Sequence, residues 1–281
     1  METGNKVSVV FEAADALLDQ TDISNSRLSI LRSGDGLSFS LLNKEKNKFV
    51  LLGSYQTSSK EDHKLLFEFI ERFTEIPGDI SYASTENTFS LVPKVLFDEN
   101  HLEKYLSLIS TDNPKSIGHK TLDEWVLVYE DSSDLTDWVK GHLPNVKVIN
   151  GAEVVISYYQ KKYKNTDTSS VFCHVMGNRL EVTAIEKGVL TLHNVFSYHS
   201  QEDFIYYVLS VFEQLKFNPE TTPILMSGWI TVLNKEISTL KKYIRNVEWE
   251  ERPSEFTYSY TFNDTATHTF NRLFQQSLCA L

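Results

Sequence analysis

The stretch LRSGDGLSFSLLNKE, residues 31–45, decides the fold of this chain of 281 residues. An apolar segment ends at its start, the turn Gly34–Gly36 follows, and apolar side chains then occupy alternate positions: Leu37, Phe39 and Leu41. Alternation with a period of two is typical of a strand, so the stretch predicts a tight β-hairpin. A glycine-rich turn could also cradle a phosphate, because backbone amides can approach phosphate oxygens closely there. A second copy of the stretch helps to separate these two interpretations.

The second copy lies 141 positions later. Residues 30–70 align without a gap with residues 171–211, and seven pairs are identical: Gly36/Gly177, Glu45/Glu186, Lys46/Lys187, Leu51/Leu192, Ser59/Ser200, Glu61/Glu202 and Asp62/Asp203. The identities are few, but apolar and polar positions keep the same spacing through three expected strands and a helix. The sequence therefore predicts an internal duplication.

Each copy predicts a three-stranded meander that leads into an amphipathic helix. The expected strands are residues 28–33, 36–43 and 48–55 in the first copy, and 171–176, 179–186 and 189–198 in the second. Each helix is expected to begin at a serine cap followed by acidic residues, in SSKED (58–62) and in HSQED (199–203). Further strands are expected after the helices, at residues 79–84 and 223–228.

The region between the copies alternates strands with helices. Strands are expected at 125–130 and 146–150, and helices at 133–142 and 152–164. This alternation predicts crossover connections, and hence parallel strands added to the sheet. A polar stretch then marks a boundary between two halves, residues 1–165 and 166–281. The expected fold class is α/β, with a mixed sheet of a meander plus parallel strands, flanked by helices, in each half.

The composition indicates an acidic protein that does not span a membrane. With 27 basic and 38 acidic residues the formal net charge is -11, which disfavours binding to nucleic acid. The longest apolar runs have the length of strands, and the first residues lack the basic and apolar blocks of a secretion signal, so a cytoplasmic location is expected. Cys173 and Cys279 suit neither a disulfide framework nor a cysteine metal site.

The order of a meander followed by alternating helices and strands, present twice, resembles the actin-like ATPase domain, which is a duplicated ribonuclease H-like fold. The chain also resembles an uncharacterised bacterial family, domain-of-unknown-function family 3822. The segments that carry this resemblance are residues 31–45, LVPKVLFDE (91–99), VFEQLKF (211–217) and ILMSGW (224–229). Since that family has no established activity, the resemblance implies a scaffold and not a reaction.

The resemblance also implies where ATP and Mg²⁺ would bind. In active actin-like proteins the nucleotide lies between the halves, held by two loops that resemble Asp-x-Gly and by a segment with paired glycines. The corresponding residues here are Asp35, Gly36, Gly177 and Gly228.

This sequence departs from the pattern at each of the three places. The position two before Gly36 is a glycine, and a shift of one residue along a strand points Asp35 to the opposite face. His174 and Val175 stand where the second loop needs a carboxylate, and Trp229 follows a single glycine where the purine would lie.

No catalytic or metal-binding residue is assigned. The chain lacks the converging carboxylates of a two-metal nuclease and the GxxxxGK[ST], GxSxG and HExxH motifs. The favoured hypothesis is a cytoplasmic, non-catalytic interaction scaffold with degenerate phosphate loops, no cofactor and an unknown protein partner, its oligomeric state left open. The alternative is a nucleotide-binding protein, a weak ATPase or a kinase, that holds ATP and Mg²⁺ in an interlobe cleft through Asp35, Gly36, Gly177 and Gly228. A third hypothesis is a nucleic-acid processing protein.

Overall fold

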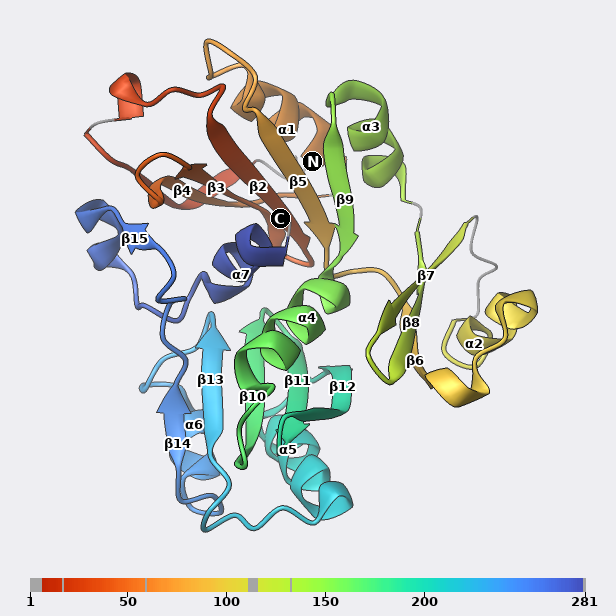
Figure 1. Ribbon diagram of the computed structural model, residues 1–281. Coiled ribbons are helices and arrows are strands. Elements are labelled where there is room, and N and C mark those ends of the chain that lie inside the picture. The colour runs from red at the N-terminus through yellow and green to blue at the C-terminus, as the bar shows by residue number, and fades with distance from the viewer. Residues whose placement is uncertain (1–6, 17, 59, 111–115, 132, 280–281) are drawn as a thin grey trace, which may run out of the picture. The chain divides into compact units, whose positions relative to one another are not determined.

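The chain forms two compact α/β units, shown in Figure 1. The structure is a computed structural model that describes residues 7–16, 18–58, 60–110, 116–131 and 133–279. Unit 1 comprises the described residues within Met1–Val154, Ser254–Asp264 and Gln275–Leu281, and unit 2 those within Val155–Pro253 and Thr265–Phe274. Each unit contains one copy of the repeat. The boundary between halves at residues 165 and 166 concerns the duplication and stays a prediction.

The main sheet of unit 1 contains the first meander. Its strand order is β1-β4-β3-β2-β5-β9, and β15 pairs with β4. The meander strands are antiparallel, whereas β2, β5 and β9 run parallel to one another. The bounds are β1 Ser8–Ala14, β2 Ser26–Ser33, β3 Gly36–Asn43, β4 Lys48–Gln56, β5 Asp79–Ser84, β9 Val146–Asn150 and β15 Thr257–Tyr258. The predicted meander and the parallel addition of 146–150 are confirmed.

Two helices cover one face of this sheet. They are α1 (Asp62–Ile70) and α3 (Asp134–His142), and their apolar side chains share one core with β2, β3, β4 and β5. Phe39 of β3 stacks on Phe69 of α1 with ring centroids 3.8 Å apart. Two further helices, α4 (Gly151–Tyr163) and α7 (Asn271–Cys279), each contain residues of both units.

The strand at residues 125–130 exists, but its predicted place in the main sheet is wrong. This strand, β8 (Trp125–Glu130), is antiparallel to β6 (Phe89–Pro93) and to β7 (Ile117–Leu122) in a separate small sheet of unit 1. The short helix α2 (Leu102–Leu106) packs on it through Leu106. The alternation of strand and helix did not predict this because residues 89–93 and 117–122 supply closer antiparallel partners.

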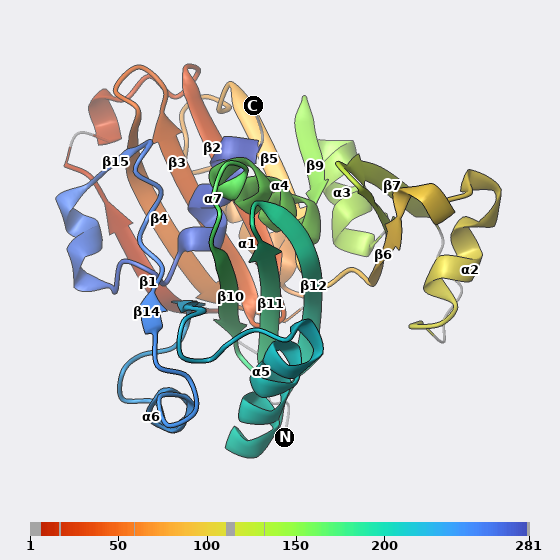
Figure 2. The same ribbon diagram turned by 60° about the horizontal axis from the view of Figure 1, so that its bottom comes forward.

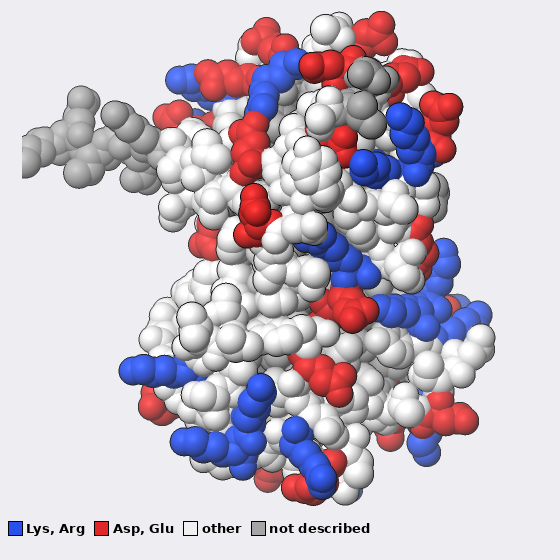
Figure 3. Space-filling view, turned by 90° about the vertical axis from the view of Figure 1, so that its left-hand side faces the viewer, with Lys and Arg blue, Asp and Glu red and all other residues white. Residues whose placement is uncertain are grey.

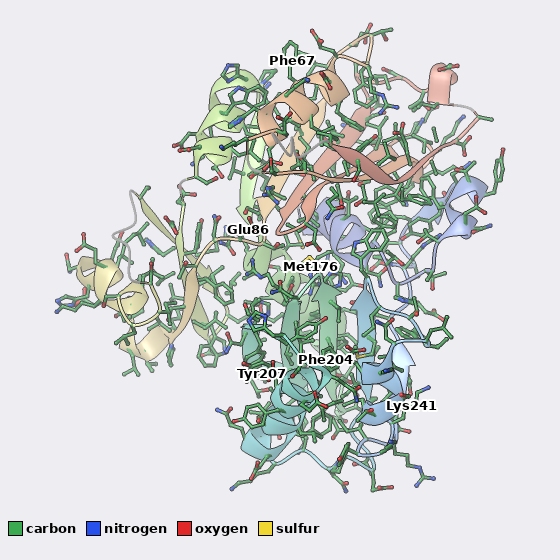
Figure 4. All side chains as sticks on the ribbon, turned by 180° about the vertical axis from the view of Figure 1, so that it is seen from behind. Phe67, Glu86, Met176, Phe204, Tyr207 and Lys241 are labelled. Carbon is green, nitrogen blue, oxygen red and sulfur yellow. The ribbon has the colours of Figure 1, made fainter. Side chains whose placement is uncertain are left out.

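Unit 2 repeats the meander and its helix, as predicted. Figure 2 shows β10 (Ser169–Met176), β11 (Arg179–Glu186) and β12 (Val189–Ser197) side by side. β13 (Ile224–Gly228) and β14 (Val247–Trp249) add to the sheet in parallel, in the order β12-β11-β10-β13-β14. The helices α5 (Gln201–Leu215) and α6 (Lys235–Leu240) pack on it, and Phe204, labelled in Figure 4, is fully buried in the shared core.

The two repeat helices begin differently. Ser200 caps α5, and Asp203 accepts back from the backbone N–H of Ser200, which together form a capping box. The serine cap predicted for α1 is wrong, because its N-cap residue is Glu61, which makes no capping bond with its side chain. Asp62, which aligns with Asp203, forms an ion pair with Arg32 instead.

No helix among the described residues has the length and apolar character needed to cross a bilayer.

Candidate functional site

Asp35 and Gly36 lie in the hairpin between β2 and β3, in unit 1. Ser33 pairs with Gly36 across a two-residue turn, and Asp35 is exposed at its tip. Gly36 has a φ of 144°, and a Cβ atom added there would lie 2.0 Å from the carbonyl oxygen of Tyr55. Of the three residues Gly34–Gly36, only Gly36 has a positive φ. Close approach of β4 therefore accounts for the glycine.

Gly177 and Gly228 lie close to one another in unit 2. Gly177 is in the turn after β10, with a φ of 56°. Gly228 ends β13 beside Val175, whose carbonyl oxygen would be 2.1 Å from an added Cβ atom. The same carbonyl accepts the backbone N–H of Trp229 at 2.8 Å, and the Trp229 ring packs edge-on against Phe270. Backbone packing again explains why position 228 is glycine.

His174 is a buried residue of unit 2. Its Nδ1 atom lies 2.9 Å from the hydroxyl oxygen of Ser227 on the neighbouring strand. Burial, helped by the positive charge of Arg272, holds the pKa of His174 well below its usual value, so the ring is neutral. No group of three or more His, Cys, Asp or Glu side chains within the described ranges could hold a metal ion.

A cavity of about 440 Å³ opens in unit 1 at the carboxyl ends of β2 and β5. Its walls include the first residues of α1 and α3, and ligands of α/β proteins commonly bind at such strand ends. The central feature is Arg32, whose Nε lies 2.7 Å from Oδ2 of Asp62. Both side chains are buried. Glu86, labelled in Figure 4, follows β5 and lies 3.6 Å from the same guanidinium.

The Arg32 guanidinium connects this cavity to the first hairpin. Its Nη1 donates to the carbonyl oxygen of Gly36 at 3.3 Å. Burial raises the pKa of the Asp62 carboxyl, and the charge of Arg32 opposes that rise. One cation thus serves two carboxylates and one backbone carbonyl, which leaves Asp62 bound to a protein side chain inside the cavity.

A second buried ion pair lies inside unit 2. Arg272 of α7 contacts Glu181 of β11 through two nitrogens, at 2.8 Å and 3.3 Å, in a bidentate arrangement. His193 of β12 lies 3.8 Å from the same carboxylate and hydrogen-bonds Thr183 at 2.9 Å. Burial raises the pKa of Glu181, and Arg272 opposes the shift. Burial lowers the pKa of His193 to about 3.

The four charged residues of these two pairs were not predicted as site residues. The sequence predicts Asp62 only as an acidic residue in the first turn of a helix, and it does not single out Arg32, Glu181 or Arg272. The partners are distant in sequence, 91 positions in the case of Glu181 and Arg272, so local spacing carries no signal for the pairing. The expectation that the second loop region holds no acid needs correction, because Glu181 lies directly opposite His174 in the sheet.

Comparisons with known proteins agree with this architecture. The chain is similar to a Bacteroides thetaiotaomicron protein with an actin-like ATPase fold and unknown function, with a TM-score of 0.68, 21% identity, and coverage of 81% of this chain and 91% of that chain. It is also similar to a chain of the PilM-PilN type IV pilus biogenesis complex, with a TM-score of 0.62, 10% identity, and coverage of 90% and 98%. These likenesses show the fold alone. No curated protein matches the sequence.

The predicted fold is therefore confirmed as a duplicated ribonuclease H-like, actin-like ATPase fold. Residues 15–247 match the family described as protein of unknown function DUF3822. This match covers most of the chain, and the chain belongs to the DUF3822 family.

Proposed function

We propose that this protein is a non-catalytic interaction scaffold with an actin-like fold. The observation that carries the proposal is that the buried carboxylate beside each hairpin is held by an internal arginine. Asp62 is 2.7 Å from Arg32, and Glu181 is 2.8 Å from Arg272. A carboxylate paired with a buried arginine is not free to bind a metal ion or to transfer a proton. A scaffold, by contrast, needs only a stable α/β frame and a binding surface.

The pairing bears directly on magnesium. Mg²⁺ is held in nucleotide sites through one or two carboxylates together with the phosphates of the substrate. A carboxylate can take that role only if it leaves its arginine, and separating one partner of a buried pair costs about 3–5 kcal/mol. This energetic cost supports the proposal that the two loops do not assemble a metal site.

The glycines are consistent with the same proposal. Gly36 and Gly228 each adopt a positive φ against a neighbouring carbonyl oxygen, so backbone packing alone accounts for them. Asp35 is exposed at the tip of the hairpin. None of these features requires a phosphate.

An interaction role needs an exposed surface, and the small sheet of unit 1 carries one. Val95, Leu96, Leu108 and Ile109 are exposed beside α2, and Leu108 is 88% exposed. Exposed apolar groups of this kind mark binding surfaces in soluble proteins. A chain similar in fold is part of a complex, the PilM-PilN complex, which supports a protein partner by analogy only.

The alternative is a nucleotide-binding protein that uses ATP and Mg²⁺. What favours it is the actin-like ATPase fold, together with the positive φ of Gly36, Gly177 and Gly228. In that case Asp35 would be the residue that organises the cation, since it is the exposed carboxylate of the first hairpin.

Isothermal titration calorimetry with ATP and Mg²⁺ separates the two functions. We expect no saturable heat from the wild-type protein and no difference for Asp35→Asn. Micromolar binding at one site per chain that needs Mg²⁺ and weakens in Asp35→Asn would establish the alternative and reject the proposal.

A second experiment tests the scaffold itself. Affinity capture from native lysate is compared for the wild type and for Leu96→Glu/Leu108→Glu, which changes two exposed side chains and leaves the core intact. We expect a partner that the wild type retains and the variant loses. Identical recovery with both proteins contradicts a role for this surface.

A further inference from the structure

The connection between β13 and α6 in unit 2 presents apolar side chains to solvent. Val232 is 60% exposed and Leu233 is 90% exposed, and both lie in the turn 231–234. Trp229 precedes this turn and is 43% exposed. These exposed side chains do not contribute to the core of unit 2. Exposed apolar groups of this kind mark sites where a protein binds another molecule or a membrane.

The turn is held rigidly from within. Asn234 accepts hydrogen bonds through Oδ1 from the backbone N–H of Thr231 at 2.9 Å and from its hydroxyl at 3.1 Å. The stem is fixed as well, since Nε2 of His268 lies 2.8 Å from the carbonyl oxygen of the buried Ile230. The exposure of Val232 and Leu233 is therefore a built feature of the turn, with little ordering cost when a partner binds.

Basic side chains accompany the apolar tip. Lys235 begins α6, Lys241 and Lys242 follow its end, and all three are exposed, as is Tyr243. Between residues 229 and 243 the chain has these three lysines and a single acid, Glu236, although the whole protein has a net charge of -11. Figure 3 shows Lys and Arg side chains interspersed with Asp and Glu side chains in the lower part of the view, and Figure 4 labels Lys241 in unit 2.

We propose that this docking face binds the surface of an anionic lipid membrane. The docking face consists of Trp229, Val232, Leu233, Lys235, Lys241, Lys242 and Tyr243. Apolar side chains enter the boundary between headgroups and acyl chains, while lysines on long stems contact anionic headgroups around them. Trp and Tyr are the aromatic residues enriched at that depth of a bilayer. The binding is peripheral.

The chemistry of the face favours lipid over a second copy of this chain. A second copy that met this face symmetrically would bring the same lysines against each other, which is repulsive. The exposed apolar group beside α2 in unit 1 makes a useful contrast, because residues 94–110 contain two lysines and three acids. Of these two exposed apolar groups, only the one around α6 combines apolar side chains with a net positive charge.

Co-sedimentation with vesicles tests the proposal. Two vesicle types are used: phosphatidylcholine alone, and equal parts of phosphatidylcholine and phosphatidylglycerol. We expect the wild type to sediment only with the anionic vesicles, and to be released by salt. Leu233→Ser should bind at least about tenfold more weakly, because it removes the apolar group that enters the bilayer. Lys241→Glu/Lys242→Glu should abolish binding.

Leu108→Ser is the matched control, since it removes an equally exposed leucine from the other apolar group and should leave vesicle binding unchanged. Thermal unfolding midpoints equal to that of the wild type show that the variants are folded. The proposal is overturned if the wild type does not sediment with anionic vesicles. This is the result expected if the true partner is an acidic protein. It is overturned equally if Leu233→Ser binds as the wild type does. Neither outcome bears on nucleotide binding, so the scaffold proposal is tested separately.

Discussion

Nε of Arg32 lies 2.7 Å from Oδ2 of Asp62, and this contact replaces the helix cap that the aligned Asp203 makes in the second copy of the repeat. Position 32 aligns with Cys173, whose side chain is buried and uncharged. One copy therefore uses its aspartate to start a helix, and the other uses it to hold a buried arginine. The duplication kept the backbone plan while the polar interactions diverged.

Removing Arg32 should be costly for folding. In Arg32→Met the Asp62 carboxylate loses its cation inside the protein, and we expect the free energy of unfolding to fall by about 3–5 kcal/mol. Urea unfolding followed by fluorescence measures the change. The control is Lys64→Met, because Lys64 and Glu68 are both exposed and 3.9 Å apart, and its effect should stay below about 0.5 kcal/mol. Similar small losses for both variants would mean that the Arg32–Asp62 pair does not stabilise unit 1.

The Glu181–Arg272 pair should show strong coupling. Either Glu181→Leu or Arg272→Leu alone leaves one buried charge, and each should lower the free energy of unfolding by about 3–5 kcal/mol. The double variant removes both charges of the pair and should be more stable than either single variant. A double-mutant cycle in urea measures this coupling. Additive losses in the cycle would show that the two side chains act independently, contrary to their bidentate contact.

The meanders and most helices could be predicted because the spacing of apolar residues along a strand or a helix is visible within a short stretch of sequence. The strands at 36–43 and 179–186 begin and end where the alternation does. The position of β8 was predicted wrongly because a strand pattern does not say which sheet the strand joins. Residues 271–279 were not predicted as a helix at all.

The polar character of α7 explains that omission. Asn271, Arg272, Gln275, Gln276 and Ser277 are buried beside the apolar Leu273 and Phe274, so burial along this helix does not follow the hydropathy of its residues. Its partners lie far away in sequence: Gln276 donates to the carbonyl oxygens of Ile30 and Ser81 in unit 1. The two buried ion pairs were missed for the same reason, since Arg32 and Arg272 each contact a partner that no local spacing indicates. The assignments of Asp35, Gly36, Gly177 and Gly228 to a nucleotide stay predictions.

Mild acid should destabilise the protein through His193. Its pKa is about 3 in the folded protein and near 6.5 in the unfolded chain, so below pH 6.5 the unfolded chain binds the extra proton. Stability is therefore lost as the pH falls from 6.5 toward 3, by about 2 kcal/mol at pH 5. Urea unfolding at pH 7 and pH 5 should show a smaller loss for His193→Asn than for the wild type. An equal loss in both proteins would show that another group causes the acid sensitivity.

Two glycines provide the sharpest test of the structural explanation for the first hairpin. Gly36 has a φ of 144° and would place a Cβ atom 2.0 Å from the Tyr55 carbonyl oxygen, so Gly36→Ala must displace β4. We expect the free energy of unfolding to fall by more than about 2 kcal/mol. Gly141 of α3 has no atom within 4 Å of an added Cβ, so Gly141→Ala should stabilise by up to about 1 kcal/mol. If Gly36→Ala is as stable as the wild type, close packing against β4 does not explain this glycine.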